Sequence, residues 1–329
     1  MMDEKILQLL REDPSAFLSG EEISRRLKVS RTAVWKRIQR LRALGYGIEA
    51  STRSGYRLIG SPDLLTPSEI KPILKTERIG KTVHYFRSLD STNSKAYQLA
   101  LNGAEEGEVV VSESQEMGRG RLGRTWFSPP FLNLYLSVIL RPKISPHQAS
   151  VITLMAAVAT ANAIREFSGL LPFIKWPNDI LLRDRKVAGL LNEIHSETDR
   201  IHFVILGIGV NLNMDENTFS REIRPVATSL KIEMKKTISR KVFLQFLLQE
   251  LERWYSIFLN EGSAGILKAW RDQAHIKGRR VTVASFGEIL AGTAIDVDSD
   301  GALIVETDDG KRKRVVAGDV EYSRQRLEG

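Results

Sequence analysis

Residues able to grip an anionic ligand gather in the segment GRGRLGRTW, residues 118–126. Its three glycines match the G-x-G-x-x-G dinucleotide pattern, and it is one residue short of a P-loop, because Arg124 stands where that motif has lysine. Both motifs need a following helix whose N-terminus faces the phosphate. Two prolines and a strand-like apolar run follow here instead. We therefore predict a loop that an anionic ligand orders, the alternative being a flexible surface loop.

Two other segments place polar side chains at predicted element ends. In SLDSTNSKAYQLALNG a strand is expected to run into a helix that Ser91 or Thr92 caps, which leaves free backbone N–H groups at one end. In EVVVSESQ a strand is expected to end at Gln115. In FVILGIGVNLN the buried strand contains Gly207 and Gly209, where a ligand or another backbone can approach closely.

The segment FIKWPNDILLRDRKVAGLLNEI is predicted to form one β-hairpin that turns at RDRK. Lys175 and Asp179 would lie on its first arm and Lys186 on its second. The two lysines could bind a polyphosphate, and the carboxylate could bind Mg²⁺. The alternative is that Trp176 and Pro177 provide only packing and a turn.

The chain offers no clear covalent nucleophile or zinc site. It contains no cysteine, and its five histidines show no metal-ligand spacing. Cations and one carboxylate without a nucleophile suit phosphoryl or nucleotidyl transfer by positioning and electrostatics.

Positive charge is concentrated near the N-terminus. Residues 21–57 hold ten basic and three acidic side chains, whereas the other residues hold 38 and 37 of a total of 48 and 40. This asymmetry is typical of a nucleic-acid-binding module.

The same segment has the pattern of a winged helix-turn-helix. Ser19 with Glu22 predicts a capping box, and Ser30 predicts the start of a second helix. On that helix, Val34, Ile38 and Leu41 would face the hydrophobic core of the domain. The outward side chains expected to contact DNA are Ser30, Arg31, Thr32, Trp35, Lys36 and Gln39, and the wing would add Arg53. The alternative is a charged helical hairpin that binds another protein.

The whole chain is expected to be an α+β multidomain protein. Residues 1–64 would form the winged helix-turn-helix, 65–272 a central α/β domain, and 273–329 a small β-barrel-like domain with turns at DSDG and DDGK. Segment 239–262 is expected to be an amphipathic core helix, with Phe243, Leu247, Trp254 and Phe258 inward. No secretory signal or bilayer-spanning stretch is recognised, so we expect a cytoplasmic protein without a membrane partner.

Several motifs together resemble one family. LDSTN, GRGRLGRTWFSP, NLYLS, KWPNDI, KVAGLLNE and GIGVNLN, in this order and spacing, resemble the biotin protein ligases. The predicted winged helix makes the bifunctional members, which are also biotin operon repressors, the best match. The resemblance covers nearly the whole chain and implies a mixed-sheet ligase domain and an SH3-like C-terminal domain.

The resemblance implies two reaction steps and a regulatory role. Biotin and ATP, with Mg²⁺, would give biotinyl-5′-AMP and pyrophosphate. A lysine of the biotin carboxyl carrier protein of acetyl-CoA carboxylase, or of other biotin-dependent carboxylases, would then take the biotinyl group. Biotinyl-5′-AMP would also act as corepressor, and a homodimer would bind operator DNA.

The resemblance also assigns residues. It implies that Lys186, Arg121, Asp179 and Lys175 are catalytic, with Asp179 as the candidate Mg²⁺ ligand. It implies biotin contacts at Ser91, Thr92, Asn93, Gln115, Arg119, Gly120, Arg121, Lys186, Gly207 and Gly209. It implies ATP or adenylate contacts at Arg119, Arg121, Arg124, Trp126, Lys186 and Asn211.

Two other functions fit part of this pattern. A lipoate ligase would also form an acyl-adenylate, and incorporation of biotin or lipoate into carrier proteins separates the two. A transcription factor that binds biotin without turnover would release no pyrophosphate from ATP and biotin.

Overall fold

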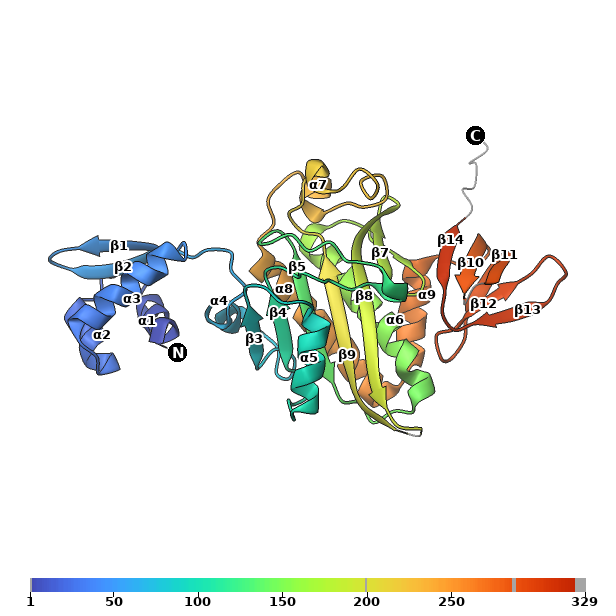
Figure 1. The fold of residues 1–329 in the computed structure, drawn as a ribbon, viewed down its shortest axis with the longest axis horizontal. Coiled ribbons are helices and arrows are strands. Elements are labelled where there is room, and N and C mark those ends of the chain that lie inside the picture. Colours follow the sequence, from blue (N-terminus) through green and yellow to red (C-terminus); the bar gives the residue numbers. More distant parts are fainter. Residues whose placement is uncertain (1, 199, 286–287, 323–329) are drawn as a thin grey trace. The chain divides into compact units, whose positions relative to one another are not determined.

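The computed structural model describes residues 2–198, 200–285 and 288–322. Its contacts divide the chain into two compact units, Met1–Ile73 and Leu74–Gly329 (Figure 1). Within the described residues, no helix combines the length and apolar character that a bilayer crossing requires.

The first unit has the predicted helix-turn-helix and wing. Its elements are α1 Met2–Glu12, α2 Gly20–Leu27, α3 Arg31–Ala43, β1 Gly47–Ser51 and β2 Gly55–Gly60. The Ser19 hydroxyl accepts the N–H of Glu22 and the Ser30 hydroxyl accepts that of Ala33, so both predicted serines cap helices. The Glu22 carboxylate accepts hydrogen bonds from Arg25 and Arg26, so only the Ser19 half of the predicted capping box is formed.

Local periodicity predicted the core of this unit. Val34, Ile38 and Leu41 are each at most 1% exposed and pack against residues of α1. After the antiparallel β1–β2 hairpin come α4 Pro67–Ile70 and a 3₁₀ turn, Lys71–Ile73. Glu69 of α4 pairs with Arg11, and Leu65 is fully buried. The first compact unit ends at Ile73, and the boundary expected at residue 64 stays a prediction.

A seven-stranded mixed sheet forms the centre of the second unit. Its strands are β3 Val83–Phe86, β4 Val109–Ser112, β5 Leu134–Leu140, β6 Phe173–Lys175, β7 Asp179–Leu182, β8 Arg185–Ser196 and β9 Ile201–Val210. The spatial order is β3-β4-β5-β9-β8-β7-β6, and only the β3–β4 pair is parallel.

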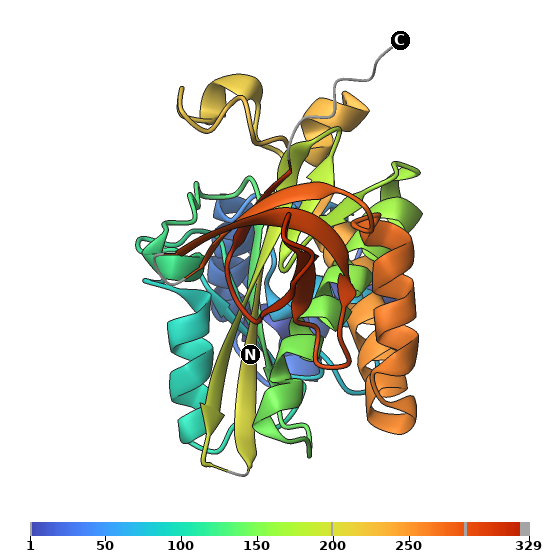
Figure 2. The same ribbon diagram turned by 90° about the vertical axis from the view of Figure 1, so that its right-hand side faces the viewer.

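Helices cover the two faces of this sheet unequally. Figure 2 shows α5 Thr92–Leu101 on one side, and α6 Ala149–Ser168, α8 Arg240–Glu261 and α9 Ala264–Ala274 on the other. The four inward positions predicted for segment 239–262 are all buried, as expected for a core helix. A short helix, α7 Leu230–Met234, ends the loop after β9.

The strand register brings candidate residues together on the face of the sheet that α5 covers. Gly207 of β9 is paired with Ser137 of β5 and Leu191 of β8, and Gly209 is paired with Gly189. Asp179 of β7 is in turn paired with Gly189. Because residues paired across strands point to the same face, these positions form one continuous surface.

The hairpin predicted for 173–194 is wrong in one respect. Its first arm is two strands, β6 and β7, so Lys175 and Asp179 face each other across a turn at residues 176–178. Pro177 lacks a backbone N–H and cannot continue a strand in a ladder, which explains the break. The second turn falls at Arg183–Asp184, within the predicted RDRK.

The C-terminal region is a five-stranded antiparallel sheet in the order β13-β12-β11-β10-β14. Its strands are β10 Arg280–Ser285, β11 Glu288–Val297, β12 Leu303–Glu306, β13 Arg312–Val315 and β14 Asp319–Tyr322. The turns at 298–301 and 308–311 lie where the sequence predicted them.

Candidate active site

A pocket opens on the α5 face of the central sheet and joins segments far apart in the chain. It is lined by Ser91, Thr92, Asn93, Gln115, Arg119, Gly120, Arg121, Arg124, Thr125, Trp126, Asn178, Asp179, Lys186, Gly189, Leu190, Leu191, Gly207, Ile208, Gly209 and Asp319. Most of the predicted ligand-binding residues therefore meet in one place. We call residues 118–126 the flap, and residues 91–93, Gln115, Ser137 and Gly207 the pocket floor.

Gln115, not a serine or threonine, closes the N-terminal end of α5. Ser91 occupies the cap position, but its side chain makes no capping hydrogen bond. The Gln115 carbonyl oxygen instead accepts the N–H of Thr92 at 2.9 Å and its hydroxyl at 3.1 Å. Gln115 lies three residues beyond the end of β4, and its amide nitrogen donates to Ser128. The predicted capping by Ser91 or Thr92 is corrected accordingly.

Two hydrogen-bond partners of Asn93, Ser137 and Glu193, were not predicted from the sequence. The buried Ser137 hydroxyl lies 2.6 Å from Asn93 Oδ1 and 2.9 Å from Thr92 Oγ1. The Asn93 amide nitrogen donates to Glu193 at 2.8 Å. A side chain at Gly207 would place its Cβ 2.2 Å from Asn93 Oδ1, so this glycine makes room for the amide. A lone serine in the apolar strand NLYLSVIL was the available signal.

Two other glycines make room for Trp126. A Cβ on Gly209 would lie 2.5 Å from the indole ring, and one on Gly189 would lie 3.0 Å from both the ring and Lys186. The Lys186 ammonium nitrogen is 5.3 Å from the ring centroid, within cation–π range. The close approach expected at Gly209 is therefore made by an aromatic side chain of the flap.

Lys186 is fixed from two directions. Its ammonium group lies 2.6 Å from the carboxylate of Asp179, across the β7–β8 pair. Its backbone N–H donates to Val226 and its carbonyl accepts from Thr228, so the loop after β9 holds both of its peptide groups. No sequence motif pointed to this loop contact.

Each flap arginine has an acceptor in a different element. Arg119 pairs with Glu193 of β8 at 3.0 Å, and Arg124 pairs with Asp319 of β14. Arg121 donates to the Asn178 side chain at 3.1 Å and to the Gly318 carbonyl at 3.3 Å. Burial lowers the pKa of the Arg121 guanidinium, and the carboxylates of Asp319 and Asp179 oppose that change. The flap thus bridges the central sheet and the C-terminal sheet.

Two predicted site residues do not line this pocket. Lys175 lies on β6 opposite Asp179, and its role stays a prediction. Asn211 is 5% exposed, and its amide nitrogen donates to the Thr228 carbonyl. Its backbone carbonyl accepts the N–H of Leu230, so Asn211 closes the loop that holds Lys186, and its adenylate contact stays a prediction.

No group of three or more His, Asp or Glu side chains that could hold a metal occurs in the described part of the chain. Asp179 is the predicted Mg²⁺ ligand, and its carboxylate is 23% exposed at the pocket. One carboxylate fits a Mg²⁺ that is held mainly by substrate phosphates, as Mg²⁺ commonly is.

Most of the predicted DNA-contacting side chains are exposed on the first unit. Arg31, Thr32, Lys36 and Arg53 are exposed, and Trp35 is 52% exposed. Other arginines of the module, such as Arg25, Arg37 and Arg57, pair with acidic residues. In residues 2–73, by contrast, no ion pair is found for Arg31, Lys36 or Arg53. Unpaired exposed cations are what phosphate contacts require.

Matches to family models define the class of protein. Residues 85–211 match the biotin/lipoate A/B protein ligase family, residues 3–57 match a helix-turn-helix domain, and residues 277–322 match the biotin protein ligase C-terminal domain. The chain is therefore a ligase of the biotin and lipoate class joined to a helix-turn-helix domain.

Similar proteins narrow this class. The bifunctional ligase/repressor BirA of Bacillus subtilis (strain 168) is 39% identical over 316 residues, which are 96% of this chain and 97% of that protein. BirA of Escherichia coli (strain K12) is 32% identical over 89% of each chain. The solved biotin protein ligase from Aquifex aeolicus in complex with biotin and ATP is 25% identical, with a TM-score of 0.64 over 74% of this chain and all of that one. The chain belongs to the family of bifunctional biotin ligase/repressor proteins.

Proposed function

We propose that this protein joins biotin to AMP with ATP, transfers the biotinyl group to a lysine of a biotin carboxyl carrier protein, and represses transcription in response to biotin. One observation carries the catalytic part. A buried, hydrogen-bonding floor and a cationic rim formed by Arg119, Arg121, Arg124 and Lys186 open into the same pocket. Such a pocket suits a small polar molecule that becomes joined to a phosphate.

The two ends of the pocket would hold different parts of the ligand. Biotin's ureido ring would bind the floor at Ser91, Thr92, Asn93, Gln115 and Gly207, where amide and hydroxyl groups converge. The flap residues Arg119, Gly120, Arg121, Arg124 and Trp126 would cover the adenylate, together with Gly209. A cover of this kind excludes water from the reactive mixed anhydride.

The first chemical step needs stabilisation of negative charge. A carboxylate oxygen of biotin attacks the α-phosphorus of ATP, and the bond to pyrophosphate breaks as the new P–O bond forms. Lys186 and Arg121 would neutralise the charge that builds up on the phosphoryl oxygens. Lys175 would act near the same phosphates or the incoming acceptor lysine. Mg²⁺ held by Asp179 and the phosphates would supply further positive charge when bound.

The proposed repression of transcription depends on the first unit. Biotinyl-5′-AMP would be the corepressor, and a homodimer would bind operator DNA through Ser30, Arg31, Thr32, Trp35, Lys36, Gln39 and Arg53. The acceptors would be carrier domains of acetyl-CoA carboxylase or other biotin-dependent carboxylases. We also infer that the C-terminal sheet is an SH3-like domain, and that 1–64, 65–272 and 273–329 are the functional regions.

The catalytic proposal is tested by pyrophosphate release with ATP and either biotin or lipoate. We expect release with biotin only. Lys186→Ala should lower the rate by about 10²-fold or more, because a charge-stabilising group is lost. Lys268→Ala, at a lysine that is 79% exposed and paired within α9, is the matched control. Release with lipoate alone, or a normal rate from Lys186→Ala, would contradict the proposal.

The regulatory proposal is tested by operator binding at several salt concentrations. Arg31→Ala and Lys36→Ala should each weaken binding and lower the salt-dependence slope by about 1. Arg25→Ala, at an arginine already paired with Glu22, is the matched control and should change the slope less. Binding that does not depend on salt would contradict a DNA-binding role for this face.

A further inference from the structure

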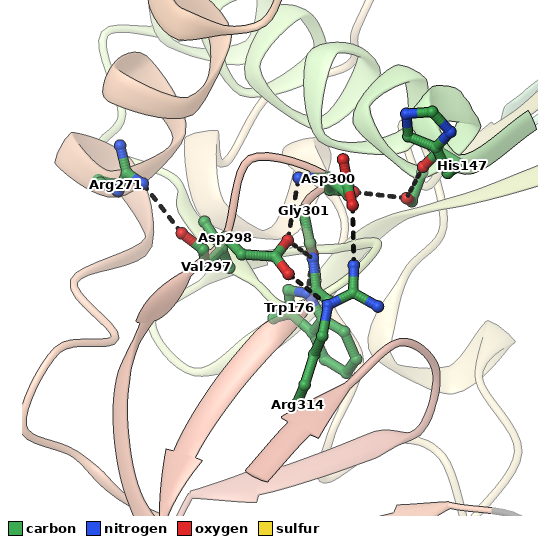
Figure 3. Close-up of polar contacts among 10 residues, drawn as sticks. His147, Trp176, Arg271, Val297, Asp298, Asp300, Gly301 and Arg314 are labelled. Atoms are coloured by element: carbon green, nitrogen blue, oxygen red, sulfur yellow. Dashed lines mark hydrogen bonds and ion pairs between the residues drawn. The ribbon is translucent and has the colours of Figure 1, made fainter. Parts of the chain in front are cut away.

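The turn between β11 and β12, residues 298–301, lies against the central domain. Figure 3 shows the contacts that hold it there. The hydroxyl of Ser150 in α6 donates to the Asp300 carbonyl at 2.5 Å, and the Trp176 indole N–H donates to the Gly301 carbonyl at 3.0 Å. At the end of β11, directly before the turn, Arg271 of α9 donates to the Val297 carbonyl at 2.9 Å.

The turn is also stiffened from within. One oxygen of Asp298 accepts the N–H groups of Asp300 and Ala302, both at 2.9 Å. The Arg314 guanidinium bridges the carboxylates of Asp298 and Asp300. Burial acts to raise the pKa of Asp298, but the hydrogen bonds from Arg314 and from the two backbone groups outweigh it and lower the pKa. The turn therefore meets the central domain as a rigid body.

The fit leaves no room for a side chain at Gly301. This residue has a φ of +82°, and an added Cβ would lie 2.8 Å from the Cδ1 atom of Leu154 in α6. Leu154 is 1% exposed, so its side chain would have to change its position within the interior to make room. Gly310, in the next turn, has a similar φ of +75°, but an added Cβ would meet nothing within 4 Å.

Trp176 connects this turn to the pocket. The indole is 2% exposed and lies in the β6–β7 connection, next to Lys175 and three residues before Asp179. Asp179 in turn holds the Lys186 ammonium group at 2.6 Å. A shift of the turn would thus move Trp176 and, with it, the carboxylate that orients Lys186.

We propose that the 298–301 turn is a positioning element of the adenylation site, acting through the Trp176–Gly301 hydrogen bond on the Asp179–Lys186 pair. Gly301 and Trp176 are not among the residues that line the pocket, so they are positioning residues. The inference rests on the proposed function, because it assigns a role in that reaction. It adds a contact through which one turn of the C-terminal sheet affects the rate of adenylate formation.

The test compares Gly301→Ala with Gly310→Ala in the full-length protein. Both substitutions add a methyl group at a positive φ, but only the first displaces the turn from Leu154. Pyrophosphate formation in a single turnover gives the maximal rate and the KM for biotin. We expect Gly301→Ala to lower the maximal rate at least about tenfold, because small misplacements of catalytic groups cost that much or more. The biotin KM should change less than about threefold, since the floor is built from other elements.

Two further variants separate positioning from loss of folding. Leu154→Val removes the obstructing methyl group, and in the Gly301→Ala background it should restore most of the rate. Trp176→Phe keeps a six-membered aromatic ring, removes the pyrrole ring with its N–H donor, and should lower the maximal rate about fivefold or more. Thermal melting of each variant shows that it is folded, and if Gly301→Ala does not fold, Trp176→Phe decides.

The outcomes distinguish the two proposals. An active wild type with equal rates in Gly301→Ala and Gly310→Ala, or an unchanged rate in Trp176→Phe, overturns the positioning role alone. A parallel change in KM and rate also overturns it, since that is the result of general structural damage. A wild type that releases no pyrophosphate with biotin overturns the proposed function and the positioning role together.

Discussion

The floor of the pocket and the flap above it are held by different kinds of interaction. Asn93 is 4% exposed and Ser137 is fully buried, and short hydrogen bonds join them. In the flap, Arg119 is 44% and Arg124 is 70% exposed, and both pair with carboxylates. Buried hydrogen bonds resist rearrangement because an unmet partner is costly, whereas exposed ion pairs add little stability. The protein therefore combines a preformed floor with a flap that can move at a small cost in free energy.

The largest effect should come from a methyl group on the floor. Gly207→Ala places its Cβ 2.2 Å from Asn93 Oδ1, so the amide must give up its hydrogen bond with Ser137. We expect the KM for biotin to rise by about 10²-fold, the upper range for a buried unpaired polar group. Gly60→Ala, at a strand glycine where an added Cβ meets nothing within 4 Å, is the control. An unchanged KM would mean that the floor is as adaptable as the flap.

A methyl group at Gly209, two residues further along β9, should change the position of the flap and leave the floor intact. Gly209→Ala places its Cβ 2.5 Å from the Trp126 ring, which must then move outward. We expect release of biotinyl-5′-AMP, followed by chase with unlabelled ligand, to become about tenfold faster, since losing an aromatic contact costs about 1 kcal/mol or more. The biotin KM should stay within about threefold of wild type. If both glycine variants changed the same constant, the two regions would not be separate.

Glu193 links the two regions, because one of its oxygens accepts from both Asn93 and Arg119. Glu193→Gln keeps an acceptor for Asn93 and removes the charge that attracts Arg119. Adenylate release should accelerate about threefold, in line with a partly exposed ion pair, and the biotin KM should not change. Glu197→Gln, at a 70% exposed carboxylate of the β8–β9 turn, is the control. A large rise in KM would place Glu193 with the floor alone.

The smallest effect is expected at Arg124. Its partner is Asp319, and the Arg124 side chain is 70% exposed, so solvent reaches the pair. Arg124→Ala should change adenylate release by about twofold or less at low ionic strength, and the difference should vanish at high ionic strength. A tenfold effect that survives high salt would show that the flap is held as firmly as the floor.

The features that were predicted best depend on residues close together in the sequence. The helix-turn-helix was predicted in detail, because caps at Ser19 and Ser30 and the 3.6-residue spacing of Val34, Ile38 and Leu41 are local patterns. The floor was predicted in part. Ser91, Thr92 and Asn93 were found, but Ser137 and Glu193 reach them only through strand register, which no short motif encodes.

The remaining misses have similar physical causes. Gln115 closes α5 from a segment 23 residues away, so no local capping signal exists for it. Asp319 reaches the flap from β14, and the packing of the two sheets has no pattern in the sequence. The break between β6 and β7 could have been predicted from the sequence, because Pro177 cannot take part in a strand ladder.

The loop that follows β9 has a consequence for how this family can vary. Surface loops usually tolerate insertions and deletions well. Here Asn211 joins the start of the loop to its end at Thr228 and Leu230, and Val226 and Thr228 bind the peptide groups of Lys186. Phe219 packs in a buried cluster, so relatives should differ in length mainly between residues 220 and 225, while a single residue added between 226 and 230 would shift the strand that carries the lysine.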